Sequence, residues 1–149
     1  MQVKDVMTSN PACCTPDTPL PEVARMMEQH DCGCIPVVED QASKKPVGMI
    51  TDRDIAVRGV AQGKDVSQMS ARDCMSTSVV TVTPEDSVDD CCKVMEDNQV
   101  RRVAVVDQQG GCCGMVSQAD VALDTSGKVS QVVREVSQPT DSTNNVQGQ

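Results

Sequence analysis

The clearest chemical signal in the sequence is a hydroxyl and a carboxylate at the same spacing in two places. Thr51 precedes Asp54 and Ser117 precedes Asp120, each time directly after a Gly-Met-aliphatic run. Thr/Ser-x-x-Asp before an apolar helix is typical of a capping box. The same residues can bind an anion and a sugar, because a helix N-terminus presents free N–H groups and a carboxylate accepts from two hydroxyls. A single copy of the motif does not distinguish the capping interpretation from the ligand-binding one.

The nine cysteines and the single histidine suggest a second chemistry. His30, Cys32 and Cys34 form H-x-C-x-C, and adjacent cysteines stand at 13–14, 91–92 and 112–113. Soft metal binding or redox sensing is the matching hypothesis, but the spacing is not the C-x₂-C of a structural zinc site. No nucleophile, base and orienting residue can be assembled from the sequence. We therefore expect no metal centre and no enzyme activity.

The segments that must position these residues are duplicated. Val6-Met7 recurs as Cys74-Met75 at an offset of 68 (74 − 6 = 68), and the Gly-Met-aliphatic run of 48–50 recurs as 114–116 at an offset of 66 (114 − 48 = 66). A loop near 41–45 and its shorter counterpart near 108–111 absorb the two-residue difference. A duplicated unit constrains the fold more firmly than local propensity does.

Periodicity predicts the same elements in each copy. Apolar residues at i, i+3, i+4 and i+7 from Leu20 and from Val88 predict amphipathic helices, with Pro19 and Pro21 or Asp86 and Ser87 at their starts. Short β-branched runs predict buried strands at 35–38, 47–50, 103–106 and 113–116. Final helices are expected from Asp52 to about Gln62 and from Gln118 to about Thr125.

The predicted fold class is therefore α+β, with two β-α-β-β-α repeats. The expected boundaries are 1–62 for the first repeat, 63–73 for a linker and 74–126 for the second repeat. Residues 127–149 are expected to hold a short helix over 129–136 and a disordered, polar tail. The two units should pack through their sheets around a pseudo-two-fold axis, with clefts between them.

The repeat also tests the cysteines. Cys91 and Cys92 align with Val23 and Ala24, so most cysteines replace small apolar residues. A buried cysteine behaves as a small hydrophobe, and packing is the preferred interpretation for most of them. Cys34 is the exception, because its counterpart is Arg102.

Composition excludes several classes of function. A net charge of −9 without Trp, Tyr or Phe leaves neither a basic stripe nor aromatic platforms for nucleic acid. No apolar run approaches the roughly 18 residues of a membrane span, and residues 1–8 are mixed polar. A cytoplasmic protein with mostly reduced cysteines is expected, and a chain of this size needs no metal or disulfide to fold.

The two halves resemble cystathionine β-synthase (CBS) domains, and together they resemble a Bateman module. The matching stretches are VMTSNPACCTPDTPL, GCIPVVED and VGMITDRDIAVRGVA, then CMSTSVVTVTPEDSV, VRRVAVVD and CGMVSQADVAL. They cover most of the chain from about Val3 to Thr125. The resemblance implies a homodimer in which four units form a flat disc.

The resemblance also implies roles for particular residues. In that family the hydroxyl of the junction contacts phosphate and the carboxylate holds the ribose. These roles carry over to Thr51 and Ser117 for phosphate and to Asp54 and Asp120 for ribose. The start of the middle strand meets adenine, which implicates Gly33, Cys34 and Ile35 in one copy and Arg102 and Val103 in the other.

Basic residues complete the implied phosphate sites, and they are unequally distributed. Arg101 and Arg102 stand at the head of the second middle strand only, and Arg53 and Arg58 are the further candidates. The two sites are therefore expected to bind unequally. Without a ring to stack on adenine, the base would lie between Cys, Ile and Val side chains.

The resemblance implies a stand-alone regulatory module that senses AMP, ADP, ATP or S-adenosylmethionine and acts on a separate, unidentified effector protein. Two alternatives belong to other classes. One is a dimerising scaffold with degenerate sites, and the other is a cysteine-based metal or redox sensor.

Overall fold

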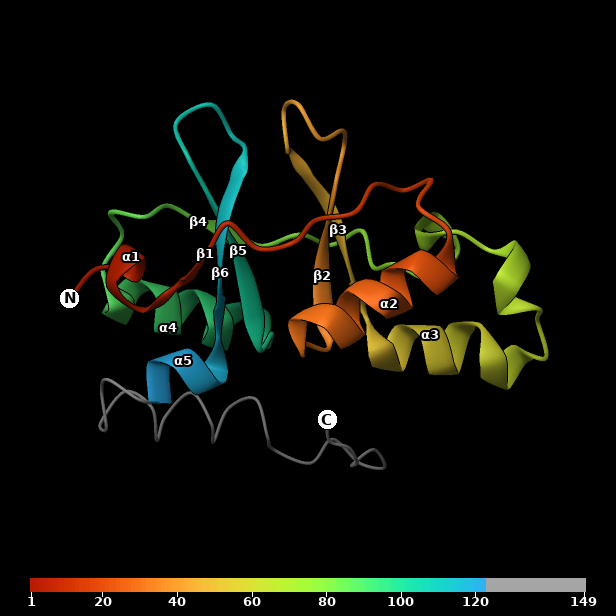
Figure 1. Ribbon diagram of the computed structural model, residues 1–149. Helices are drawn as coiled ribbons and strands as arrows, with labels where there is room; N and C mark the ends of the chain where they lie inside the picture. Colours follow the sequence, from red (N-terminus) through yellow and green to blue (C-terminus); the bar gives the residue numbers. More distant parts are fainter. Residues whose placement is uncertain (123–149) are drawn as a thin grey trace.

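The computed structural model describes residues 1–122 (Figure 1). The first half forms α1 (Val3–Val6), β1 (Thr8–Ser9), α2 (Leu20–His30), β2 (Cys34–Val38), β3 (Pro46–Thr51) and α3 (Asp52–Arg58). Three 3₁₀ turns follow as η1 (Val60–Gln62), η2 (Val66–Gln68) and η3 (Ala71–Asp73). The second half forms β4 (Thr81–Val82), α4 (Val88–Asn98), β5 (Arg102–Val106), β6 (Cys112–Ser117) and α5 (Gln118–Ala122). The α+β class and the duplication are confirmed.

Two antiparallel hairpins stand side by side at the centre of the molecule (Figure 1). β2 pairs with β3 so that Cys34 opposes Thr51, and β5 pairs with β6 so that Arg102 opposes Ser117. Each ladder shifts register near the end of its first strand, before the hairpin loop. β-branched side chains are frequent in β2, β3 and β5, which suits buried, pleated strands. The predicted strand pairs are therefore present in matching register.

The short strand before each hairpin lies in its own half, and the segment before that strand crosses to the other half. β4 pairs parallel with β5, and Cys14 forms a parallel bridge with β2, so the predicted β-α-β-β-α order is present in each half. β1 lies antiparallel to β6, with Thr8 opposite Met115, so the larger sheet has the order β1-β6-β5-β4. At the equivalent place Ser76 forms an antiparallel bridge with Met49 of β3. The crossing of these two segments between the halves was not predicted from the sequence.

Helices α2 and α4 follow the predicted pattern, with one difference. Ser87 caps α4 by accepting a hydrogen bond from the Asp90 N–H at 3.0 Å, as the sequence predicted. Each helix buries an apolar stripe against its own hairpin, but Ala24 on α2 is exposed whereas its counterpart Cys92 on α4 is 1% exposed. The expected burial of Ala24 is therefore wrong. α2 is covered less completely than α4 in the described part of the chain.

The helix predicted from Asp52 to about Gln62 is shorter in the structure. α3 ends at Arg58, and the chain continues as the 3₁₀ turn η1. A Cβ at Gly59 would lie 2.8 Å from the Ile55 carbonyl oxygen and 2.9 Å from Val66 Cγ1, so η2 packs tightly over this glycine. The helix therefore ends at a glycine, a weak helix former, over which the following turn packs closely. The predicted helix at 129–136 and the tail lie outside the described residues.

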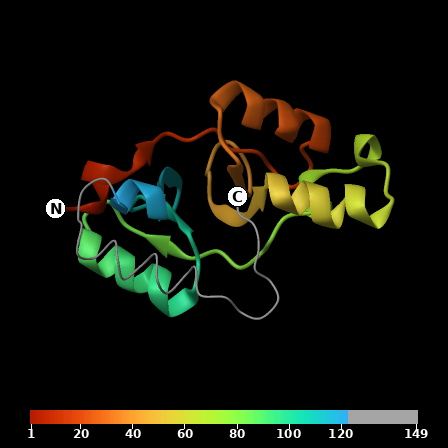
Figure 2. The same cartoon turned by 90° about the horizontal axis from the view of Figure 1, so that it is seen from below.

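The apolar core has two large clusters, one for each half, and a smaller one between the hairpins. Val66, Met69 and Ala71, from the segment predicted as a linker, pack into the first large cluster. The repeat and linker boundaries expected from the sequence remain a prediction, because residues of the expected linker pack in the same cluster as residues of the first repeat. Seen from below, α2 and α3 lie on one side of the hairpins and α4 and α5 on the other (Figure 2). Within residues 1–122, no helix has the length and apolarity to span a membrane.

Candidate functional site

Both Thr/Ser-x-x-Asp motifs form capping boxes. The Asp54 N–H donates to Thr51 Oγ1 at 3.0 Å and the Thr51 N–H donates to Asp54 Oδ2 at 3.0 Å. The second motif repeats this geometry: the Asp120 N–H donates to Ser117 Oγ at 3.2 Å, and the Ser117 N–H donates to Asp120 Oδ2 at 2.8 Å. The capping interpretation of both motifs is therefore confirmed.

The capping boxes leave acceptor capacity on the two aspartates. Oδ2 of each carboxylate is engaged, and Oδ1 of Asp54 and of Asp120 accepts no hydrogen bond from residues 1–122. Both side chains are half-buried. A carboxylate has about four lone-pair sites, so a cap of this kind can bind a further donor. Capping and ligand binding are compatible uses of these residues.

A cleft of about 490 Å³ lies between the two halves and contains the second junction. Six of the residues predicted for a site line it, namely Gly33, Cys34, Ile35, Arg102, Ser117 and Asp120. The volume is within the range of pockets for small molecules. The cleft therefore combines the junction of the second half with the middle strand of the first.

Eight further residues line the cleft that the sequence did not assign to a nucleotide site, although His30 and Cys32 belong to the H-x-C-x-C motif. They are Thr8, Ser9, Asn10, Pro11, Ala12, His30, Cys32 and Met115. Most belong to β1 and the segment after it, which reach the cleft because β1 pairs with β6. Sequence comparison of the two halves could align this segment with residues 76–80. The sequence of this segment carries no signal that shows which half of the chain the strand pairs with.

Five predicted site residues do not line this cleft, namely Thr51, Arg53, Asp54, Arg101 and Val103. Val103 is fully buried in the core of the second half, whereas Arg53 and Arg101 are exposed.

Arg58, a further candidate for phosphate binding, has a structural role instead. Its Nη1 donates to the carbonyl oxygens of Cys74 and Met75 at 3.1 and 3.0 Å. It thereby ties α3 to the chain segment that crosses between the halves.

The wall of the cleft beside Gly33 is close to the side chain of Asp52. A Cβ there would lie 2.9 Å from Asp52 Oδ2, and the Asp52 N–H donates to the Gly33 carbonyl oxygen at 3.0 Å. Burial raises the pKa of the neighbouring Cys34 thiol to about 11, and the nearby Arg102 opposes this rise. Cys34 is therefore a neutral thiol at pH 7, and its Sγ lies 3.5 Å from Met49 Sδ.

The cysteines are mostly packed in apolar surroundings. Five of them are buried, namely Cys14, Cys74, Cys91, Cys92 and Cys112, and all nine are free thiols. No group of three or more His, Cys, Asp or Glu side chains within the described residues is arranged to hold a metal ion. The burial of these five agrees with the interpretation that they fill space in the core.

Comparisons with known proteins show the same architecture. The family model of the CBS domain matches residues 3–59 and 71–123. The CBS domain-containing protein YhcV of Bacillus subtilis is 42% identical over 122 residues, covering 82% of this chain and 84% of the relative.

Two solved structures are similar over nearly their whole length. Hypoxic Response Protein I with two coordinated zinc ions aligns with a TM-score of 0.73 and 30% identity, covering 84% of this chain and 99% of that one. The same protein, from Mycobacterium tuberculosis, is among the curated relatives at 34% identity over 119 residues. The CBS domain pair of protein MJ0100 in complex with 5-methylthioadenosine and S-adenosyl-L-methionine aligns with a TM-score of 0.72 and 28% identity. The alignment covers 83% of this chain and 98% of that one.

Proposed function

Because this chain belongs to the CBS domain family, we propose that its cleft binds an adenosyl ligand and that the bound state regulates a separate protein. The position of Asp120 supports this proposal most directly. Its half-buried carboxylate lines the cleft and keeps Oδ1 free of hydrogen bonds within residues 1–122. The pair of adenosyl ligands named for the similar MJ0100 structure supports the same ligand class.

The ribose of the ligand would bind at the second junction. Asp120 Oδ1 can accept hydrogen bonds from two vicinal hydroxyls, while Oδ2 continues to cap α5. The cap holds the carboxylate in place before the ligand arrives, so little side-chain entropy is lost on binding. Capping thus prepares the acceptor for the sugar.

The base would lie against an aliphatic wall. Pro11, Ala12, Ile35 and Met115 line the cleft, and the sequence has no Phe, Tyr or Trp. β1 is the edge strand of its sheet, so its outer backbone groups have no strand partner among the described residues. Those groups can hydrogen-bond the polar edge of a base, which an aliphatic wall alone cannot do.

The 5′ substituent would meet few positive charges. Arg102 is the one arginine or lysine among the residues that line the cleft, and Asp120 offsets its charge. This balance favours AMP, 5-methylthioadenosine or S-adenosylmethionine over ADP and ATP, because each added phosphate needs further cations or N–H donors.

We extend the proposal to the first junction as a weaker, unequal site. Thr51 and Asp54 repeat the geometry of Ser117 and Asp120, and the bridge between β3 and Ser76 repeats the pairing of β6 with β1. In this first site Arg53 and Arg101 would contact the phosphate, and Val103 would contact the adenine. Its affinity should differ because the residues around the two junctions differ.

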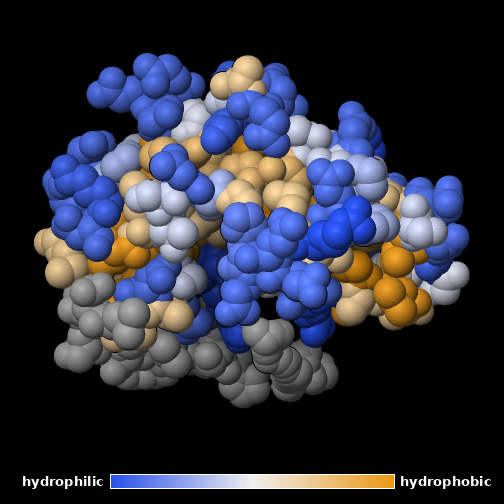
Figure 3. Space-filling view, viewed as in Figure 1, coloured by the Kyte–Doolittle hydropathy of each residue, from blue (hydrophilic) through white to orange (hydrophobic). Residues whose placement is uncertain are grey.

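The output of the module would pass through a homodimer and an unidentified effector. Val57 and Val60 are 42% and 60% exposed, and an apolar area covers the region of α3 and η1 (Figure 3). Exposed apolar patches of this kind often mark protein interfaces. Ligand would shift the dimer between two geometries only if it binds them with different affinity.

Calorimetric titration tests the ligand proposal. S-adenosylmethionine, 5-methylthioadenosine, AMP, ATP and GMP would each be titrated into the purified protein, with melting temperature as a second readout. Adenosyl ligands should bind and GMP should not. Absence of binding and of any melting shift with every adenosyl compound at millimolar concentration would overturn the proposal.

Substitution of Arg102 by Ala separates the phosphate contact from the rest of the cleft. The affinity for AMP should fall about 10-fold or more, because a charge-assisted contact is lost. The affinity for 5-methylthioadenosine, which has no phosphate, should change less than threefold. An equal loss for both ligands would contradict the role of Arg102 at the phosphate.

A further inference from the structure

Two cysteines from opposite halves of the chain meet between the hairpins. Cys112 begins β6 and packs with Val38 and Ala104 in the small central cluster, and Cys13 packs against that cluster. Cys112 is 5% exposed, and Cys13 is half-buried. The residues are 99 positions apart in the sequence (112 − 13 = 99), so the contact depends wholly on the packing of the two halves.

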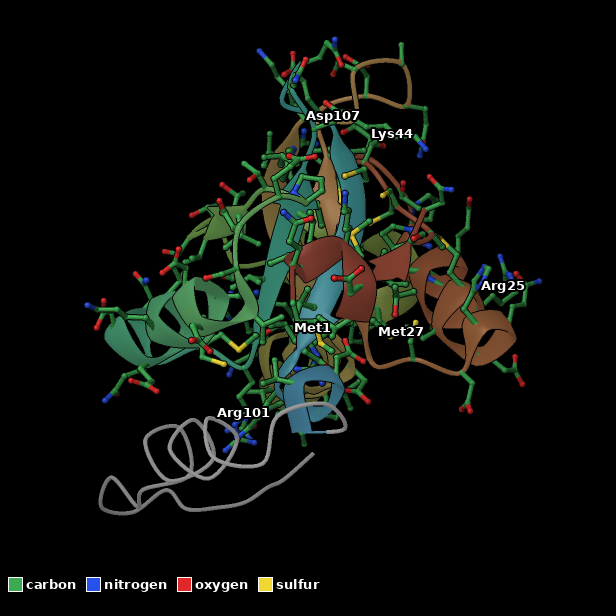
Figure 4. All side chains as sticks on the ribbon, turned by 90° about the vertical axis from the view of Figure 1, so that its left-hand side faces the viewer. Met1, Arg25, Met27, Lys44, Arg101 and Asp107 are labelled. Carbon is green, nitrogen blue, oxygen red and sulfur yellow. The ribbon has the colours of Figure 1, made fainter. Side chains whose placement is uncertain are left out.

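The loop between β2 and β3 holds this pair in place. The Cys112 N–H donates to the Lys44 carbonyl oxygen at 2.7 Å, and the Gln41 side-chain amide donates to the Cys13 carbonyl oxygen at 3.1 Å. Figure 4 shows Lys44 and Asp107 close together near the ends of the two hairpin loops. Both cysteine backbones are thus fixed by the same loop.

The internal repeat does not account for the pair. At the pseudo-symmetric place the counterpart of Cys13 is Thr81 (13 + 68 = 81), and the counterpart of Cys112 is Pro46 (112 − 66 = 46). The duplicated fold therefore accommodates residues other than cysteine at both positions. Two thiols are present on one side of the molecule only.

The two thiols differ in acidity. A hydrogen bond from the Cys112 thiol, together with the charge of Lys44, lowers the pKa of Cys13, although burial opposes the change. The same interaction and burial raise the pKa of Cys112. When both are protonated, Cys13 Sγ donates to the Pro11 carbonyl oxygen at 3.4 Å and Cys112 Sγ to that of Gly114 at 3.5 Å. One thiol is thus primed as a nucleophile and the other remains protonated beside it.

We propose that Cys13 and Cys112 form a hydroperoxide-reactive dithiol site that closes into a disulfide between the two halves. The Cys13 thiolate attacks one peroxide oxygen, the O–O bond breaks, and the departing alkoxide takes a proton to become an alcohol. Cys112 then attacks the sulfenic sulfur of Cys13, and its proton leaves with the hydroxide as water. The two sulfurs lose two electrons and the peroxide gains them.

The neighbouring cysteines are less suited to this chemistry. Cys14 is 1% exposed, and burial raises its pKa to about 12. Cys113 is half-buried, and burial raises its pKa as well. Cys32 is exposed and serves as an internal indicator that the oxidant reached the protein. The site is independent of whether the cleft binds an adenosyl ligand.

Peptide mapping of the full chain tests the proposal. The reduced protein would be treated with hydrogen peroxide, blocked with N-ethylmaleimide and digested with trypsin. Trypsin releases Cys13 and Cys14 in peptide 5–25 and Cys112 and Cys113 in peptide 103–128. We expect these two peptides joined, with a mass two hydrogens below their sum, and separated again by dithiothreitol.

Substitutions identify which cysteines are joined. The joined peptide should disappear in Cys13→Thr, which copies Thr81, and in Cys112→Ala as a second variant. It should persist in the controls Cys14→Val and Cys113→Val, which copy the counterparts Val82 and Val47. Circular dichroism of each variant confirms that it folds.

Two outcomes would overturn the proposal. One is a wild-type protein in which Cys32 is oxidised but peptides 5–25 and 103–128 stay separate. The other is a joined peptide that survives in folded Cys13→Thr, since the bond would then involve a different cysteine.

Discussion

Substitution of Asp120 by Asn should weaken ligand binding while leaving the fold intact. Asn keeps a side-chain oxygen that can accept from the Ser117 N–H, now at 2.8 Å, so the cap on α5 is retained. It replaces the free carboxylate oxygen with an amide NH₂ group, which cannot accept from a ribose hydroxyl. The substitution therefore removes the proposed ligand contact and little else.

The expected loss follows from the strength of charged hydrogen bonds. A hydrogen bond to a charged group contributes about 1.5–3 kcal/mol, and every 1.4 kcal/mol is tenfold in affinity. Loss of one such contact therefore predicts about a 10- to 150-fold increase in Kd for the adenosyl ligand. Isothermal titration of wild type and variant with the same ligand measures this ratio.

Asp54→Asn is the matched control. Asp54 has the same capping geometry, with the Thr51 N–H donating to its Oδ2 at 3.0 Å, but it does not line the cleft. Its substitution should change stability as little as Asp120→Asn does, and it should leave the tighter site unaffected. Equal weakening by both variants would refute the assignment of Asp120, and so would weakening by Asp54→Asn alone.

Two further predictions concern packing and thiol reactivity. Gly48→Ala should lower the free energy of unfolding by about 1–3 kcal/mol, because its Cβ would lie 2.5 Å from the Ser76 carbonyl oxygen. Gly114→Ala should cost less, since its nearest contact is the flexible side chain of Met7; equal urea midpoints would contradict this difference. With a pKa of about 11, Cys34 is roughly 0.1% thiolate at pH 8, so its alkylation by iodoacetamide should accelerate nearly tenfold per pH unit up to about pH 10. A flat rate between pH 8 and pH 10 would show that its thiol is not buried in this way.

Local features of the fold were predictable because their partners are close in sequence. The capping boxes involve residues three positions apart, and the side-chain types alone specify both hydrogen bonds. The hairpins join strands separated by short polar loops, and β-branched runs of matched length determine their register. The Ser87 cap on α4 follows from the same kind of local rule.

The end of α3 was not predicted from the apolar pattern. Apolar and helix-forming residues continue past Gly59 to Gln62, so periodicity alone extends the helix. The structure ends it at Arg58, just before Gly59, and η2 from the following segment packs against the glycine. The position of the glycine was a stronger signal than the apolar pattern that continues past it.

The sequence by itself determined that the chain is two similar units and that each junction carries a capped carboxylate. Only the tertiary structure decided that β1 pairs with β6, that the Asp120 carboxylate faces Gly33 and Ile35 across one cleft, and that Cys13 meets Cys112. The physical reason is the shortness of the local signal. β1 is two residues long and both are exposed, so it carries no alternation that could specify a partner strand, and the packing of the whole chain places it beside β6.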